Sequence, residues 1–142
     1  MNFQKIGFIG LGLIGGSIAK KIKANCPETQ IYATAHHIET IQEAYKEGII
    51  ENSNLLSMSD FSECDCIFLC APVQRNLDYL AQLKDIIKKD CYITDVGSTK
   101  TEIHEEVIRL DMEANFIGGH PMTGSEKTGI SAANAALLEN AY

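Results

Sequence analysis

A glycine-rich turn near the start of the chain constrains the fold more than any other stretch. The turn, Gly10-Leu11-Gly12-Leu13-Ile14-Gly15-Gly16-Ser17, follows an apolar segment at 5–9 that predicts a short buried strand. Apolar residues then recur at 14, 18, 19 and 22, which is the spacing of an amphipathic helix. The glycines therefore stand where a strand passes into a helix, the context in which G-x-G-x-x-G indicates dinucleotide binding.

Each glycine of this pattern has a physical reason. Gly10 allows the tight turn, Gly12 lets backbone approach a pyrophosphate, and Gly15 lets the helix pack close to the strand. The unpaired N–H groups at the start of the helix would then face the phosphates. The competing interpretation is a glycine turn that only saves space. The cofactor-contacting residues predicted here are Gly10, Gly12, Leu13, Ile14 and Gly15.

Strand and helix patterns alternate along the whole chain. This alternation predicts one domain over residues 1–142, with a doubly wound, mainly parallel α/β fold of the Rossmann-like type. The later helices are expected at 38–46 and 76–89, then over a stripe of Ile103, Val107, Ile108 and Leu110, and at 132–138. The expected strands lie at 5–9, 31–35, 66–70, 91–94 and 115–117.

The end of the second strand departs from the usual dinucleotide pattern. An acidic residue commonly stands there and binds the adenosine ribose hydroxyls, whereas this chain has Ala35, followed by His36 and His37. Either His36 contacts a 2′-phosphate, or backbone and water hold the ribose and both histidines are solvated. We expect NAD and NADP to be discriminated by less than about tenfold. No metal is expected here, because neighbours on an extended segment point apart.

Three further strand ends deliver candidate functional residues to the same edge of the sheet. Ala71 is small enough to let a cofactor lie against it, and with Pro72 and Gly97 it completes the predicted cofactor-binding set. His120 stands on a glycine–proline turn and suits the removal of a hydroxyl proton near neutral pH. Ser98 is the hydroxyl expected to orient the imidazole or the substrate. A purely structural histidine is the alternative.

Composition excludes several other classes of protein. The net charge is −7 and no basic cluster appears, so a nucleic-acid partner is not expected. No apolar run approaches the roughly 20 residues of a membrane span, and the first strand leaves no room for a signal peptide. The five cysteines favour a reducing cytoplasm. Cys64 and Cys66 are interpreted as buried, inert thiols rather than as a metal site.

Four stretches together identify the chain by resemblance. They are Gly-Leu-Gly-Leu-Ile-Gly-Gly-Ser at 10–17, Ala-Pro-Val at 71–73, Asp-Val-Gly-Ser-Thr-Lys at 95–100, and Gly-Gly-His-Pro-Met-Thr-Gly-Ser-Glu-Lys-Thr-Gly at 118–129. With these, the chain resembles the prephenate/arogenate dehydrogenases of tyrosine biosynthesis over essentially its whole length. The first stretch is shared by many dehydrogenases, whereas the last two together are quite specific to this family.

The resemblance implies an activity and roles for individual residues. The family oxidatively decarboxylates prephenate to 4-hydroxyphenylpyruvate, or arogenate to tyrosine, and reduces NAD or NADP. His120 would take the proton of the ring hydroxyl, Ser98 would be its partner there, and Ser125 and Glu126 would lie by the substrate entrance. The resemblance also implies a second, helical domain that closes the cleft and forms a homodimer, so we expect the isolated domain to be inactive.

Two rival functions stay open at this point. One is another NAD(P)-dependent hydroxy-acid dehydrogenase, although those generally take a catalytic lysine from a later helix. The other is a non-catalytic module that senses a nucleotide and controls a partner. Such a module would need no base, so a change at His120 would have no consequence. The sequence does not decide whether the substrate is prephenate or arogenate, or whether the cofactor is NAD or NADP.

Overall fold

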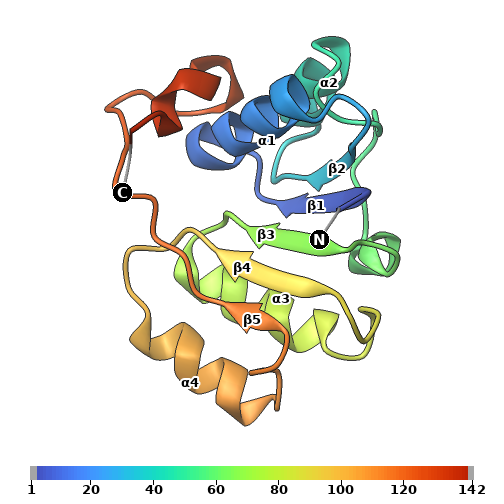
Figure 1. Ribbon diagram of the computed structural model, residues 1–142, viewed down its shortest axis with the longest axis vertical. Helices are drawn as coiled ribbons and strands as arrows, with labels where there is room; N and C mark the ends of the chain where they lie inside the picture. The colour runs from blue at the N-terminus through green and yellow to red at the C-terminus, as the bar shows by residue number, and fades with distance from the viewer. Residues whose placement is uncertain (1–2, 141–142) are drawn as a thin grey trace.

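The computed structural model describes residues 3–140 and consists of a parallel sheet with helices on both sides (Figure 1). Its strands are β1 (Lys5–Ile9), β2 (Gln30–Thr34), β3 (Cys66–Leu69), β4 (Tyr92–Asp95) and β5 (Phe116–Ile117). Its α-helices are α1 (Leu13–Asn25), α2 (Ile38–Lys46), α3 (Val73–Leu83) and α4 (Thr101–Arg109). Three short 3-10 helices cover Met58–Phe61, Ile130–Ala132 and Ala135–Leu138.

All neighbouring strands are parallel, in the order β2-β1-β3-β4-β5. The chain winds from β1 to the edge strand β2, then crosses to β3 on the other side of β1. This reversal makes the carboxyl ends of β1 and β3 the topological switch point, where such sheets open a crevice for a ligand. The doubly wound α/β fold predicted from the sequence is confirmed.

Alternate side chains of the strands are buried on opposite faces of the sheet. Phe8 of β1 packs with the helices α1 and α2, whereas Ile9 packs with α3 and α4. The strand β3 divides in the same way between Phe68 and Ile67. Figure 1 shows the two helix pairs on the two sides of the sheet. Burial on both faces explains why these strands are apolar throughout.

The end of α2 shows how local sequence sets a boundary. Gly48 follows the last turn with φ +72°, and its N–H donates to the Tyr45 carbonyl at 2.9 Å. The N–H of Ile49 donates to the carbonyl of Ala44 at 3.0 Å. These two bonds form a Schellman motif, which ends the helix and needs a residue that tolerates positive φ. The predicted bounds of this helix, 38–46, are confirmed.

The predicted bounds of the third helix are wrong at both ends. The sequence predicts a helix over 76–89, but α3 spans Val73–Leu83. Pro72 presets the backbone for a helix start, and its carbonyl accepts from the N–H groups of Arg75 and Asn76 at 2.9 and 3.0 Å. After Leu83 the chain tightens, since Ile86 donates to the Leu83 carbonyl in a three-residue turn.

Two smaller expectations are also corrected. Ile108 is 50 % exposed rather than buried, because α4 turns Ile103 and Val107 inward and Ile108 lies off that face. The helix predicted over 132–138 is two 3-10 helices, at Ile130–Ala132 and Ala135–Leu138. Asn134 separates them: its backbone is extended and its side chain accepts from the Ala136 N–H at 2.9 Å, which starts a new turn.

The C-terminal segment packs on the first helix (Figure 1). A Cβ added at Gly16 would lie 2.5 Å from Ile130 and 2.8 Å from Ala133, so the glycine permits this close approach. Ser17 Oγ accepts from the Asn134 N–H at 2.9 Å. The segment after β5 is thus held on the α1 side of the sheet. Within residues 3–140, no helix is long and apolar enough to cross a membrane.

Candidate active site

A cleft of about 610 Å³ opens at the carboxyl ends of β1, β2 and β3. It lies at the switch point of the sheet, where the predicted glycine turn meets the end of β3. Its lining includes predicted cofactor residues from all three strand ends, which the fold has brought together: Gly10, Gly12, His36, Ala71 and Pro72. Gly97, the remaining predicted cofactor residue outside the first turn, does not line this cleft.

The three glycines of the first turn differ in what surrounds them. Gly10 has φ +94°, and a Cβ there would lie 2.8 Å from the backbone nitrogen of Ala71. A Cβ at Gly15 would lie 2.7 Å from the carbonyl oxygen of Gly10. Apart from its chain neighbours, no atom of the described residues lies within 4 Å of a Cβ placed on Gly12. Gly10 and Gly15 therefore allow close contacts within the protein, whereas the absence of a side chain at Gly12 leaves space open in the cleft.

The start of α1 is equipped for an anion. Its first internal bond runs from the Gly16 N–H to the Gly12 carbonyl at 2.9 Å, so the N–H groups of Leu13, Ile14 and Gly15 lack partners within the helix. No side chain caps the helix at Gly12, and its first turn holds no acidic residue. A phosphate there would gain hydrogen bonds and the favourable end of the helix dipole.

At the end of β2 the two histidines stand together. His37 is the residue before α2, and the rings of His36 and His37 meet edge to face with centroids 4.6 Å apart. The expectation that they point apart is wrong: the rings are in contact, although the backbone at His37 is still extended (φ −115°, ψ 135°) and α2 begins only at the next residue. Within residues 3–140, no group of three or more histidine, cysteine or acidic side chains could hold a metal ion.

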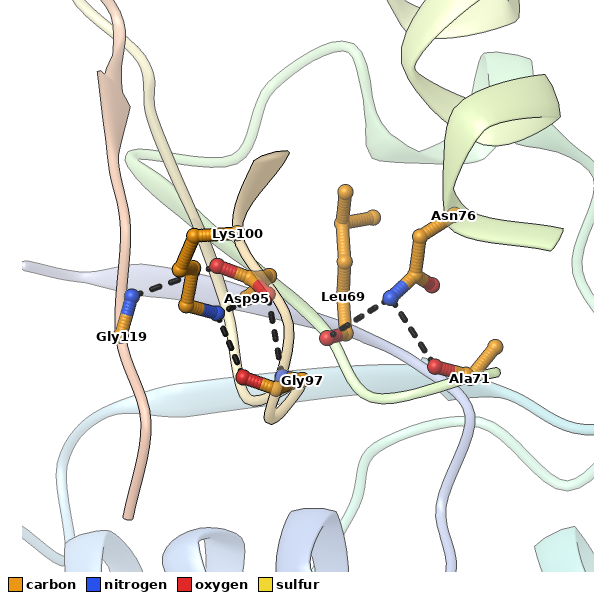
Figure 2. A network of polar contacts seen from close by, with 7 residues as sticks. All are labelled: Leu69, Ala71, Asn76, Asp95, Gly97, Lys100 and Gly119. Atoms are coloured by element: carbon orange, nitrogen blue, oxygen red, sulfur yellow. Dashed lines mark hydrogen bonds and ion pairs between the residues drawn. The ribbon is translucent and has the colours of Figure 1, made fainter. Parts of the chain in front are cut away.

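Asn76 fixes the turn that follows β3. Its side-chain nitrogen donates to the Ala71 carbonyl at 2.9 Å and to the Leu69 carbonyl at 3.5 Å (Figure 2). The side chain is fully buried, and its Oδ1 has no hydrogen-bond partner among the described residues. The sequence pattern predicts only that this residue lies in a helix. A polar residue four positions after the strand-end proline is the signal that was available.

Asp95 organises the second half of the site. Its carboxylate is 1 % exposed and accepts from the N–H groups of Gly97 at 3.0 Å and Gly119 at 3.2 Å. The Lys100 ammonium forms an ion pair with the same carboxylate and donates to the Gly97 carbonyl at 2.6 Å. Figure 2 shows these groups gathered where the loops after β4 and β5 meet. One buried charge thus joins the two loops that the sequence predicts to be neighbours.

His120 follows Gly119 and is exposed between two cavities. One cavity, of about 520 Å³, lies between α4 and β5 and includes Lys100 and Phe116. The other, of about 340 Å³, is bounded by Ile18, Phe68 and Leu138. The described part of the chain contains no hydrogen bond between His120 and Ser98, which is also exposed. The imidazole is therefore accessible to a ligand from either cavity.

The other predicted substrate residues lie farther along the same loop. Ser125 and Glu126 are exposed and line neither cavity that His120 borders. Ser125 Oγ accepts from the Lys127 N–H at 3.1 Å, a bond local to the loop. The structure thus brings His120 next to the Asp95 network without bringing Ser125 or Glu126 into the same cavity.

The buried thiols near the sheet are unreactive. Cys64 and Cys66 are buried, and burial raises the pKa of Cys64 to about 12 and that of Cys66 to about 11. Burial also raises the pKa of Cys70, which stands at the floor of the cleft. These thiols stay protonated at neutral pH and are poor nucleophiles.

The fold and the site together define a dinucleotide-binding dehydrogenase domain. A sequence model of the family described as "Prephenate dehydrogenase, nucleotide-binding domain" matches residues 18–142. The prephenate dehydrogenase of Lactococcus lactis is 45 % identical over 98 % of this chain and 40 % of its own length. That of Bacillus subtilis is 39 % identical over 100 % of the chain and 39 % of its own length. The chain belongs to the prephenate dehydrogenase family.

Solved structures agree with this assignment. Aquifex aeolicus prephenate dehydrogenase, in complex with hydroxyphenyl propionate and NAD+, superposes with a TM-score of 0.89 at 30 % identity, over 99 % of this chain and 49 % of its own. Synechocystis arogenate dehydrogenase superposes with a TM-score of 0.82 at 32 % identity, over 94 % of this chain and 46 % of its own. A 3-hydroxybutyryl-CoA dehydrogenase from Ralstonia eutropha, at 18 % identity, shares the fold alone. The chain spans about two fifths of the length of the curated relatives.

Proposed function

We propose that this domain binds a nicotinamide dinucleotide along the cleft and serves, within the complete enzyme, the NAD(P)-dependent oxidative decarboxylation of prephenate or arogenate. The observation that carries the proposal is the open space at Gly12, between the uncapped start of α1 and the end of β3. A side chain there would fill the place that a pyrophosphate needs. The residues present therefore fit the cofactor, whose nicotinamide supplies the hydride acceptor when bound.

In this proposal each part of the chain has a defined task. Gly12 and the first N–H groups of α1 hold the pyrophosphate, and Ala71 and Pro72 border the cofactor from the end of β3. His120 accepts the proton of the ring hydroxyl as the substrate is oxidised at the same carbon. Loss of the ring carboxylate as carbon dioxide then makes the ring aromatic, which drives the reaction. Ser98 orients the hydroxyl, and Ser125 and Glu126 stand at the substrate entrance.

The Asp95 network explains how a loop histidine can act as a base. Catalysis by proximity requires the group to be held in one place, and loops are the mobile parts of a fold. Here the residue before His120 is tied by its N–H to a buried carboxylate, which an ammonium group neutralises. Most of the protein's contribution is therefore placement of charge and of reacting groups.

Further parts of the proposal concern the complete enzyme. We place the elements that close the substrate cleft and pair two copies in a helical domain outside the matched stretch, since the relatives are more than twice as long. The substrate carboxylates need cationic partners, and these would come from there. The five free cysteines of the chain support a reducing, cytoplasmic setting.

Two measurements test the proposal. Calorimetry of the 142-residue chain with NAD and with NADP should detect binding of at least one. The complete enzyme should form reduced nicotinamide when prephenate or arogenate is added, with release of carbon dioxide. If neither nucleotide binds, the proposal is wrong. If a nucleotide binds but the complete enzyme oxidises neither substrate, a sensing module or another hydroxy-acid dehydrogenase takes its place.

A further inference from the structure

Three basic side chains line the cleft at the switch point. His36 and His37 come from the loop after β2, and Arg75 comes from the first turn of α3. Thr40, in the first turn of α2, adds a hydroxyl beside them. Within residues 3–140, the side chains of these four residues make no hydrogen bond or ion pair. Arg75 follows a different strand from the histidines, and the fold places it in the lining of the same cleft.

Among residues 3–140, no carboxylate lines the same cleft. None of the residues lining it is aspartate or glutamate, although the chain carries 19 acidic residues and a net charge of −7. An acidic protein with a wholly non-acidic cleft is suited to an anionic ligand at that cleft. The Arg75 guanidinium is exposed, while its backbone N–H is fixed on the Pro72 carbonyl at 2.9 Å, so the side chain starts from a defined place.

NAD and NADP differ in the group on the adenosine ribose, and the two groups need different protein partners. A ribose 2′-hydroxyl is best recognised by a carboxylate, which accepts its hydrogen bond and repels a 2′-phosphate. A 2′-phosphate is best recognised by arginine, whose planar fork binds phosphate oxygens in pairs, with help from histidine and hydroxyl donors. The described lining of the cleft contains an arginine, two histidines and a hydroxyl, and it contains no carboxylate.

We infer that the β2 end of the cleft, formed by His36, His37, Thr40 and Arg75, receives the 2′-phosphate of an adenosine ribose, so that the domain prefers NADP to NAD. This inference rests on the proposed function, because it concerns the cofactor that the same cleft binds. A preference for NADP replaces the weak discrimination between NAD and NADP that is expected from the sequence, where His36 is the only residue predicted to contact the 2′-phosphate. The preference should be at least about tenfold, which corresponds to about 1.4 kcal/mol.

Calorimetry on the 142-residue chain tests this, with four ligands: NADP, NAD, adenosine 2′,5′-bisphosphate and adenosine 5′-monophosphate. The two smaller probes lack nicotinamide and so report on the adenosine end alone. NADP and the bisphosphate should each bind at least about tenfold more tightly than their partners without the 2′-phosphate. Raising the salt concentration should weaken NADP binding more than NAD binding, because the additional contact is ionic.

Three variants locate the contact. Arg75→Ala should lower NADP affinity at least about tenfold and change NAD affinity less than about twofold. His36→Asp should reverse the preference, because it puts a carboxylate next to the end of β2, where it repels the phosphate. Arg109→Ala is the matched control: it removes one arginine from α4, where Arg109 pairs with Glu106, and should leave both affinities unchanged.

The outcomes separate this inference from the function beneath it. Equal affinities, or tighter binding of NAD, would overturn the inference while leaving dinucleotide binding intact. An Arg75→Ala variant that loses NAD and NADP to the same extent would also overturn it, since the guanidinium would then contact the adenine or pyrophosphate shared by both. Failure to bind any of the four ligands would overturn the proposed function and the inference together.

Discussion

The Oδ1 atom of Asp95 accepts a hydrogen bond from the backbone N–H of Gly119, at 3.2 Å. The bond joins the last residue of β4 to the residue immediately before His120. A Cβ at Gly119 would lie 2.6 Å from the Asp95 carbonyl oxygen, so the two loops touch where glycine allows it. The position of the candidate base therefore depends on a buried carboxylate.

Replacing Asp95 with asparagine should weaken this junction. The side chain keeps its shape, but it loses its charge, its ion pair with Lys100 and one acceptor for the two glycine N–H groups. Because Lys100 is 36 % exposed and can turn to water, we expect a loss of about 1–3 kcal/mol in the free energy of unfolding. Urea denaturation of the 142-residue chain measures this.

Asp85→Asn is the control for that experiment. Asp85 is exposed, and its side chain makes no hydrogen bond or ion pair within the described part of the chain, so its loss should change stability by less than about 0.5 kcal/mol. If the two variants are equally stable, Asp95 does not hold the loops together. The account of how His120 is positioned would then fail.

Local patterns predict most of the fold correctly. The glycine turn locates β1 and the start of α1, because few strand-to-helix passages tolerate three glycines in this spacing. The apolar run at 66–70 identifies a central strand, since both of its faces are covered by helices. Errors arise at the ends of elements: the apolar periodicity continues through Ile86 and Ile87, although α3 stops at Leu83, and Ile87 still packs against the core.

The site is harder to predict because it depends on residues far apart in sequence. The roles of Gly10 and Gly15 follow from local spacing, and the structure gives each a close contact as the reason. Asp95 stands at a predicted strand end, yet its bond to Gly119 spans 24 positions. Arg75 lines the same cleft as the two histidines because β2 and β3 lie on either side of β1.

Gly12→Val should separate binding from folding. Beyond its chain neighbours, a Cβ at Gly12 meets no atom of residues 3–140 within 4 Å, so the variant should keep the wild-type fold and stability within about 1 kcal/mol. The branched side chain would occupy the space beside the start of α1 and should weaken dinucleotide binding by at least about a hundredfold, about 2.7 kcal/mol. Calorimetry and urea denaturation of the same sample measure the two effects.

Two other glycines serve as controls for Gly12→Val. In the described part of the chain, a Cβ at Gly124 likewise meets no atom within 4 Å beyond its chain neighbours, but Gly124 does not line the cleft, so Gly124→Val should change neither property. Gly15→Ala should destabilise the fold, because its Cβ would lie 2.7 Å from the Gly10 carbonyl oxygen. Unchanged nucleotide affinity in Gly12→Val would show that the pyrophosphate lies elsewhere.

Asp65 should give the chain an acid-sensitive component of stability. Its carboxylate, 24 % exposed, binds the Lys88 ammonium and accepts from the N–H groups of Lys5 and Gln4 at 2.8 and 2.7 Å. These contacts, the Lys88 hydrogen bond first among them, hold the pKa of Asp65 below its ordinary value. Stability from a lowered pKa is present above the unfolded value, about 3.9, and is lost as the pH falls through the folded value.

Urea denaturation of the wild type and of Asp65→Asn should show this. At pH 7 the variant should be less stable by about 1 kcal/mol, a modest effect because the pair is partly solvated. Below about pH 4 the gap should shrink as the wild-type carboxylate gains a proton. A gap that is constant from pH 7 to pH 3 would mean that Asp65 acts through shape and hydrogen bonding rather than through its charge.

The sharpest prediction for catalysis concerns His120 and uses the complete enzyme. His120→Asn should keep the fold, cofactor affinity and substrate affinity, since the imidazole is exposed and makes no hydrogen bond within the described residues. The loss should fall on kcat, by about 10²–10⁴-fold, the usual contribution of general acid–base catalysis. The wild-type rate should rise with pH as a base loses its proton, and that rising limb should be absent from the variant.

The loss of kcat in Ser98→Ala should be smaller than in His120→Asn, because the substitution removes only the group that orients the hydroxyl. Near-normal turnover in His120→Asn, or a defect confined to cofactor binding, would place the base on another residue.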